Sequence, residues 1–164
     1  MKIRLALKSD AEQIAKIYNQ GIEDRIATFE TTLKSLADIE ALCNEVYPVV
    51  VVENHDEIAA FASSSAYRPS RACYIGVAEV SCYVERAFRG KGAGRIVTTA
   101  LMEECTKKGF WKLVSRVFPE NKISRKLLYS LGFREVGVYE KHSKLDNVWK
   151  DVVIVEYLIH KNII

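Results

Sequence analysis

Long apolar runs and an excess of charge of one sign are both missing from this sequence. No apolar stretch reaches the roughly eighteen residues that a membrane-spanning helix requires. The N-terminus alternates like a strand and lacks the apolar core of a targeting sequence. The 24 Lys and Arg residues are scattered among 21 Asp and Glu residues, for a net charge of +3. We therefore expect neither a membrane nor a nucleic acid as a partner.

Cysteine pairs at metal-ligand spacing are missing as well. None of the four cysteines stands in a CxxC or similar arrangement, so the sequence predicts no zinc site and no other metal. Each lies in an apolar run or on a helical pattern, where a free cysteine usually behaves as a small buried hydrophobe. We expect reduced thiols and a cytoplasmic protein. The four are Cys43, Cys73, Cys82 and Cys105.

What is present is the composition of an ordinary globular protein. Of the 164 residues, 49% are hydrophobic and 27% are charged, and there are no repeats or low-complexity tracts. This length predicts one domain over residues 1–164, with enough apolar side chains for a core.

The periodicity of apolar residues predicts a mixed α/β (α+β) protein. Strands are expected at residues 2–6, 49–52, 58–65, 74–85, 113–118, 134–142 and 149–159. Helices are expected after Ser9-Asp10, after Ser35, from a glycine-rich turn to Gly109, and over 121–131, with 21–32 as a helix end that runs into a loop. This order predicts one sheet of about six or seven strands with helices on both faces.

A glycine-rich turn, RGKGAGR, lies between a predicted strand and a predicted helix. Glycines leave the backbone N–H groups uncovered, and together with the positive end of the helix these groups form a phosphate site. The turn is not a Walker loop, because no GK[ST] follows, and it lacks the last glycine of the dinucleotide fingerprint. The alternative is a plain turn beside a solvated basic patch. The glycine-rich turn consists of Arg89, Gly90, Lys91, Gly92, Ala93, Gly94 and Arg95.

The residues around this turn resemble a known superfamily. Arg-x-x-Gly-x-Gly after a long strand resembles the coenzyme A pyrophosphate loop of the GNAT acetyltransferases. Asn121-x-x-Ser124, followed by LGF at 131–133, is similar to their next signature, which lies beside the pantetheine arm. The resemblance covers the whole chain and implies the GNAT fold, splayed between strands 4 and 5, with acetyl-CoA as co-substrate. It implies that acetyl-CoA is bound by residues 89–95 with Cys82, Tyr83, Val84, Asn121 and Ser124.

Within that superfamily the chain resembles the phosphinothricin, methionine sulfoximine and arsinothricin acetyltransferases. Four segments carry the likeness: IYNQGIEDRIATFET, RACY at 71–74, VAEVSCYV, and YEKHSKLDNVWKDVVIVE. The resemblance implies acetylation of the primary amine of a small amino-acid-like molecule, in detoxification or resistance, by a homodimer whose subunits complete each other's site. It implies substrate binding by Phe29, Glu30, Arg71, Ala72, Cys73 and Tyr74.

Glu79 and Tyr83 are the candidate catalytic residues. An aliphatic amine is mostly protonated near neutral pH, so a base must remove a proton before the nitrogen attacks a thioester. Glu79 lies in an otherwise almost uncharged strand, where burial should make its carboxylate a stronger base. Strand alternation puts Tyr83 on the same face, nearer the turn. The alternatives are that Glu79 pairs with an arginine such as Arg71, and that Tyr83 is a packing aromatic.

One position departs from the resembled pattern. Many GNAT members have a tyrosine five residues before the Phe of LGF, as an acid for the departing thiolate, but this chain has Leu128 there. Tyr129 is rotated by about 100° around a helix and is not assigned that role. Two other functions stay open: a protein acetyltransferase acting on N-termini or lysines, and a non-catalytic acyl-CoA-binding module.

Overall fold

The computed structural model describes all 164 residues and contains one seven-stranded sheet, four α-helices and four 3-10 turns. The strands are β1 (Lys2–Leu5), β2 (Val49–Asn54), β3 (Glu57–Ala66), β4 (Val77–Val84), β5 (Lys112–Val117), β6 (Arg134–Leu145) and β7 (Val148–Leu158). The helices are α1 (Ala11–Glu23), α2 (Leu36–Leu42), α3 (Ala93–Lys107) and α4 (Lys122–Ser130). The 3-10 turns are η1 (Lys8–Asp10), η2 (Ala72–Tyr74), η3 (Arg86–Phe88) and η4 (His160–Asn162).

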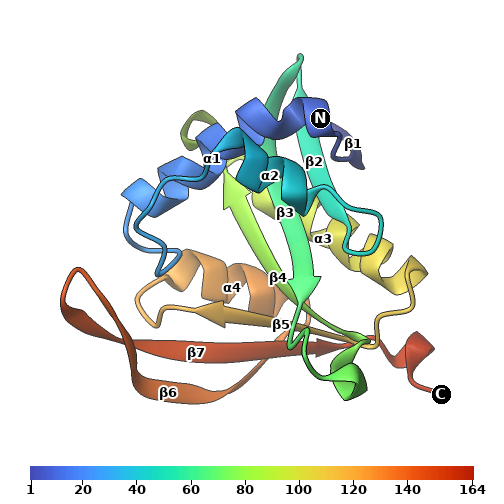
Figure 1. Cartoon of the computed structure of the whole chain (residues 1–164), viewed down its shortest axis with the longest axis vertical. Coiled ribbons are helices and arrows are strands. Elements are labelled where there is room, and N and C mark those ends of the chain that lie inside the picture. Colours follow the sequence, from blue (N-terminus) through green and yellow to red (C-terminus); the bar gives the residue numbers. More distant parts are fainter.

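The sheet has the strand order β1-β2-β3-β4-β5-β7-β6, and every neighbouring pair is antiparallel except β4 and β5. Helices α1 and α2 pack on one face of the sheet, and α3 and α4 pack on the other (Figure 1). The predicted mixed sheet with helices on both faces is therefore confirmed.

The parallel pair in the middle of the sheet opens along its length. Only three residues of β4, Val77 to Glu79, are in register with β5, opposite Lys112 to Val114. Beyond Glu79 the two strands diverge, and the Ser115 hydroxyl donates a hydrogen bond to the Val80 carbonyl at 2.9 Å. This is the predicted splay, and it leaves backbone groups of β4 without a neighbouring strand.

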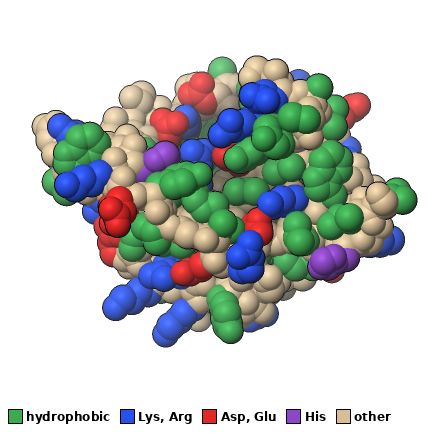
Figure 2. Space-filling view, turned by 90° about the horizontal axis from the view of Figure 1, so that it is seen from below, with side chains coloured by type: hydrophobic (Ala, Val, Ile, Leu, Met, Phe, Trp, Pro, Cys, Tyr) green, Lys and Arg blue, Asp and Glu red, His purple; other side chains and the backbone are tan.

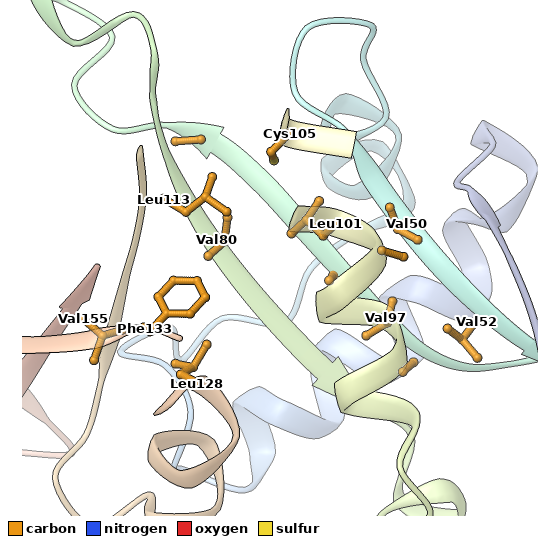
Figure 3. Packing of buried hydrophobic residues seen from close by; sticks show 14 of the residues in the cluster. Val50, Val52, Val80, Val97, Leu101, Cys105, Leu113, Leu128, Phe133 and Val155 are labelled. Atoms are coloured by element: carbon orange, nitrogen blue, oxygen red, sulfur yellow. The ribbon is translucent and has the colours of Figure 1, made fainter. Parts of the chain in front are cut away.

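The larger hydrophobic core lies between α3, α4 and the sheet. In the close-up, the helix side chains Val97, Leu101 and Cys105 point at the strands, and Phe133 fills the space beside Val80 (Figure 3). Val97 and Leu101 are fully buried because the helical period puts them on the sheet side. Burial raises the pKa of the Cys105 thiol to about 12, so this cysteine is the buried hydrophobe that the sequence predicts.

The strand predicted over residues 74–85 is shorter than expected. Residues 72–74 form η2, and β4 begins only at Val77. The indole ring of Trp111 lies 1.9 Å from the place where a Cβ on Gly76 would be, so only glycine lets this ring approach the backbone. Because Cys73 lies in the exposed turn, the expectation that every cysteine is buried is wrong at this position.

The start of α1 also differs from the prediction. The Asp10 carboxylate does not cap the helix but accepts hydrogen bonds from the Leu7 N–H at 2.7 Å and from the Arg4 guanidinium at 2.6 and 2.8 Å. Arg4 also pairs with Glu53 on β2, so this cluster ties β1 to the helix and to the next strand.

The Asp10 cluster makes stability depend on pH. Asp10→Asn should lower the free energy of unfolding at about pH 7 by about 1–3 kcal/mol, the value of hydrogen bonds to a charged group. The Arg4 guanidinium holds the pKa of the Asp10 carboxyl below its ordinary value. The pKa is lower in the folded state than in the unfolded one, so this stabilisation is complete above about pH 4. It is lost as the pH falls through the folded-state pKa.

Calorimetric melting across acid pH tests this prediction. The difference in Tm between wild type and Asp10→Asn should narrow below about pH 4. The control is Glu57→Gln, which removes an exposed carboxylate that makes no ion pair. A difference in Tm that is the same at every pH would contradict the assignment.

The surface carries mixed charges. On the face in Figure 2, Lys and Arg side chains are interspersed with Asp and Glu instead of gathering in one basic area. None of the helices has the length and hydropathy to cross a bilayer. No three or more His, Cys, Asp or Glu side chains converge into a group that could hold a metal ion.

Candidate active site

Two cavities meet where β4 and β5 diverge. The sheet-face cavity, of about 820 Å³, has a floor of β4, β5 and β7 residues and a wall formed by residues 27–30. The loop cavity, of about 610 Å³, lies between the end of β4, the glycine-rich turn and the N-terminus of α4. Residues that line both cavities include Val80, Ser81, Tyr83 and Arg116. A molecule in one cavity can therefore reach a molecule in the other through the splay.

The glycine-rich turn has the backbone that the sequence predicts. Gly90 and Gly92 have φ of 75° and 85°, and a Cβ at either would meet no other atom of the chain. Gly92 is the residue before α3, so the first N–H groups of that helix, which have no intrahelical acceptors, lie at the loop cavity. This is the geometry of an anion site.

The basic residues of the turn are held in different ways. Arg89 lines the loop cavity and is paired with Asp24 at 2.7 Å, and Arg95 lines it with a hydrogen bond to Ser130 at 2.7 Å. Lys91 does not line the cavity, and its ammonium lies over the Phe88 ring. The two arginines are therefore better placed than the lysine for a ligand in this cavity.

The other predicted donor-site residues lie in the same cavity. Asn121 and Ser124 line it from the start of α4, where the Asn121 side chain accepts the Ser124 N–H at 3.2 Å. Cys82 and Val84 line it from β4, and burial raises the pKa of the Cys82 thiol to about 11. Cys82 therefore stays a neutral thiol near pH 7 and is no nucleophile there.

Glu79 lies in the sheet-face cavity, but with a different partner from the one considered above. Its Oε2 atom is 2.9 Å from a guanidinium nitrogen of Arg116 on β5, and Arg71 makes no contact with it. The Glu79 side chain is 25% exposed, so it is less buried than a position in a central strand suggests. The reason is the splay, which opens the sheet beside Glu79.

Tyr83 is both a packing residue and a cavity residue. Its ring stacks on Tyr18 and Phe61, with centroids 4.7 and 5.4 Å away, and a Cβ on Gly21 would clash with it. Burial, with a further contribution from Tyr18, raises the pKa of the Tyr83 phenol above its ordinary range. The phenol therefore stays a neutral hydrogen-bond donor at the junction of the two cavities.

The predicted substrate residues fall into two groups. Phe29 and Glu30 line the sheet-face cavity, and Phe29 packs edge-on against Phe118 at 4.9 Å. Residues 71–74 do not line the sheet-face cavity, and the Arg71 guanidinium lies over the Tyr74 ring instead. The structure thus brings the first group to Glu79 and leaves the second on the surface.

Arg116 and His142 add to the site. Arg116 was missed by the sequence analysis, although a single charge in the apolar run LVSRVF is the same signal that singled out Glu79. His142 lies at an irregularity between β6 and β7, lines the sheet-face cavity and packs against Tyr139.

The position of the usual tyrosine acid is occupied by a core residue. Leu128 is buried in the main cluster, whereas Tyr129 is 78% exposed and lines neither cavity. No tyrosine of α4 is therefore available as an acid.

Comparison with known proteins identifies the family. A model of the acetyltransferase (GNAT) family matches residues 12–133. This chain belongs to that family. Among its GNAT relatives, the L-methionine sulfoximine/L-methionine sulfone acetyltransferase of Salmonella typhimurium is 34% identical over 160 residues, 95% of this chain and 93% of that protein.

Solved GNAT structures have the same fold. A phosphinothricin acetyltransferase from Sinorhizobium meliloti, in complex with acetyl-CoA, matches with a TM-score of 0.88 and 26% identity, over 96% of this chain and 87% of the other. A ribosomal-protein-alanine N-acetyltransferase from Brucella melitensis matches with a TM-score of 0.92 and 27% identity, over 97% and 100%. The predicted family, fold and acetyltransferase class are therefore confirmed.

Proposed function

We propose that this acetyltransferase transfers an acetyl group from acetyl-CoA to the primary amine of a small amino-acid-like acceptor. The observation that carries the proposal is the position of Glu79, a carboxylate at the splay where the sheet-face cavity and the loop cavity meet. We also propose that residues 1–164 act as a single domain.

The loop cavity fits the donor. The uncovered N–H groups at Gly92 and the start of α3, together with Arg89 and Arg95, suit a pyrophosphate. Asn121 and Ser124 line the path from there towards the splay. When bound, the donor supplies an acetyl group as a thioester, whose carbonyl the exposed N–H groups of β4 would polarise.

Glu79 acts as the base in this proposal, directly or through a water molecule. It takes a proton from the acceptor ammonium, and the freed nitrogen forms a bond to the thioester carbonyl carbon. The carbon–sulfur bond then breaks and its electron pair leaves with sulfur. The nitrogen gives up its second proton and the thiolate takes up a proton, so the products are the N-acetylated acceptor and free coenzyme A thiol. The Tyr83 hydroxyl, at this junction, would hold the acceptor or donate a hydrogen bond to the water molecule. With Leu128 in place of a tyrosine, no tyrosine of α4 protonates the thiolate.

The sheet-face cavity receives the acceptor. Phe29 and Glu30 form one wall, and the floor provides Glu79. The relatives are named as acetyltransferases of methionine sulfoximine, methionine sulfone and phosphinothricin, which supports acceptors of this class. A role in detoxification or resistance is part of the same proposal.

A homodimer and a cytoplasmic location belong to the same proposal. Strand β6 is exposed along nearly its whole length, including the apolar residues Val136, Val138 and Tyr139, which suits an interface with a second copy. Residues 71–74, which lie outside their own chain's cavity, would then be available to the partner's site. The four free cysteines agree with a reducing compartment.

A thiol-release assay with acetyl-CoA tests the function. Phosphinothricin, methionine sulfoximine, arsinothricin and an ordinary amino acid serve as small acceptors, and a peptide with a free N-terminus serves as the competing class. We expect at least one small acceptor to exceed the peptide in kcat/KM. Turnover of the peptide alone would favour a protein acetyltransferase, the activity of the Brucella melitensis neighbour. No turnover of any acceptor, with Tm still raised by acetyl-CoA, would indicate a non-catalytic acyl-CoA-binding module.

A further inference from the structure

Arg116 is the only lysine or arginine among the residues that line the sheet-face cavity. We propose that it binds the α-carboxylate of the acceptor, so that the enzyme selects free α-amino acids over amines that lack this group. The inference rests on the proposed function and names the part of the acceptor that the site recognises.

The Arg116 guanidinium is positioned by its strand and is available to a ligand. It projects from β5 on the same face of the sheet as Glu79, two residues beyond the last paired position, Val114. Its one hydrogen bond within the chain goes to Glu79 at 2.9 Å, and its side chain is 52% exposed. A guanidinium has five N–H donors, so most of its donors have no partner within the chain.

The charges of Glu79 and Arg116 match those of an amino-acid zwitterion. An α-amino acid carries its ammonium and its carboxylate on one carbon, and the ion pair in the cavity presents the opposite charges at a similar spacing. On binding, the ammonium pairs with Glu79 while the carboxylate pairs with Arg116 in the bidentate manner that guanidinium groups favour. One ion pair within the protein is thus exchanged for two with the ligand.

Acceptors without a free carboxylate cannot make this exchange. An amine that binds Glu79 alone separates it from Arg116, and the half-exposed guanidinium then gains only water in place of the lost ion pair. A peptide N-terminus also lacks a free carboxylate at this position, because the α-carboxyl group of its first residue is in an amide bond. His142, Glu30 and Glu79 are the other titratable groups of the cavity besides tyrosine, and none of them is a permanent cation. Arg116 is therefore the group in the cavity that distinguishes acceptors with a free α-carboxylate from their amides.

The test compares one acceptor in two forms. The best free amino acid from the thiol-release assay and its α-carboxamide are assayed with wild type, Arg116→Gln, Arg116→Lys and, as a control for the loss of an exposed cation, Lys107→Gln. Lys107 lies at the end of α3, pairs with Glu104 and lines neither cavity. Arg71→Gln is included because Arg71 is the other candidate for an anionic group.

We expect wild type to prefer the acid, and Arg116→Gln to lower kcat/KM for the acid by about 10- to 100-fold, the loss of hydrogen bonds to a charged group. The carboxamide should change by no more than about threefold, because it does not use the charge. The loss should appear mainly in the KM of the acid, with KM for acetyl-CoA and Tm unchanged. Arg116→Lys should recover part of the loss, and Lys107→Gln should behave as wild type.

Several results would overturn the inference while leaving the proposed function intact. Two concern Arg116→Gln: equal losses of kcat/KM for the acid and the carboxamide, or a raised KM for acetyl-CoA. The third is that Arg71→Gln, and not Arg116→Gln, abolishes the preference for the acid. The fourth is that wild type has the same kcat/KM for the carboxamide as for the acid. Failure of wild type to acetylate any small amine would overturn the proposed function itself, and this inference with it.

Discussion

Glu79→Gln should lower kcat/KM for the acceptor amine by about 100-fold or more, the contribution typical of a general base. The amide is nearly isosteric with the carboxylate but cannot take a proton, so the ammonium that predominates near neutral pH stays unreactive. The loop cavity should be unaffected, because Glu79 lines only the sheet-face cavity. Acetyl-CoA should therefore raise the Tm of the variant as much as that of wild type.

The pH profile separates a base from a residue that only holds the substrate. In Glu79→Gln, kcat/KM should keep rising with pH as the free amine becomes more abundant, up to the pKa of the acceptor itself, whereas the wild type should level off earlier. The control is Glu104→Gln, which removes a carboxylate of α3 that is paired with Lys107 outside both cavities. Activity within about threefold of wild type at neutral pH would exclude Glu79 as the base.

Gly92→Ala should lower the affinity for acetyl-CoA by about tenfold or more, as expected when a helix N-terminus loses charge-assisted contacts with phosphate. Gly92 has φ of 85° and precedes α3, and the space that its Cβ would enter is open in the chain. In the proposed complex the pyrophosphate would occupy that space, so a methyl group there would hold the phosphate away from the N–H groups.

Gly109 offers a matched control at the other end of the same helix. It has φ of 87°, a Cβ there would also meet nothing, and it lines neither cavity. Gly92→Ala and Gly109→Ala should therefore cost similar stability, about 1–2 kcal/mol for a left-handed alanine. Only Gly92→Ala should weaken binding of acetyl-CoA, measured by titration calorimetry. Equal affinities in the two variants would show that the turn does not hold the phosphates.

Features set by a few neighbouring residues could be read from the sequence. Ser35 caps α2 in reciprocal hydrogen bonds with Asp38, and Asn121 caps α4, because short polar side chains at those positions satisfy the first N–H groups locally. The glycine-rich turn followed from the left-handed backbone that Gly90 and Gly92 permit. Alternation along β4 placed Glu79 and Tyr83 on one face, and Cys82 and Val84 on the other, as observed.

Features that depend on distant residues were predicted poorly. The strand expected from Tyr74 begins only at Val77, because the ring of Trp111 packs against the backbone at Gly76. Trp111 lies 35 positions further along the chain. Residues 71–74 were predicted to bind the substrate, but the turn that they form lies outside the sheet-face cavity of its own chain. Neither outcome follows from local preference, because each depends on which side chain packs against that segment.

The sequence by itself therefore determined the family of this protein, the backbone of its glycine-rich turn and the face on which its candidate base lies. These depend on backbone preferences and on the two-residue repeat of a strand, which act over a few residues. Only the tertiary structure decided that Glu79 faces Arg116 and that the two cavities meet beside them. The pairing of β4 with β5 ends after Glu79, and this loss of register between two distant segments opens the sheet and brings the two charges together.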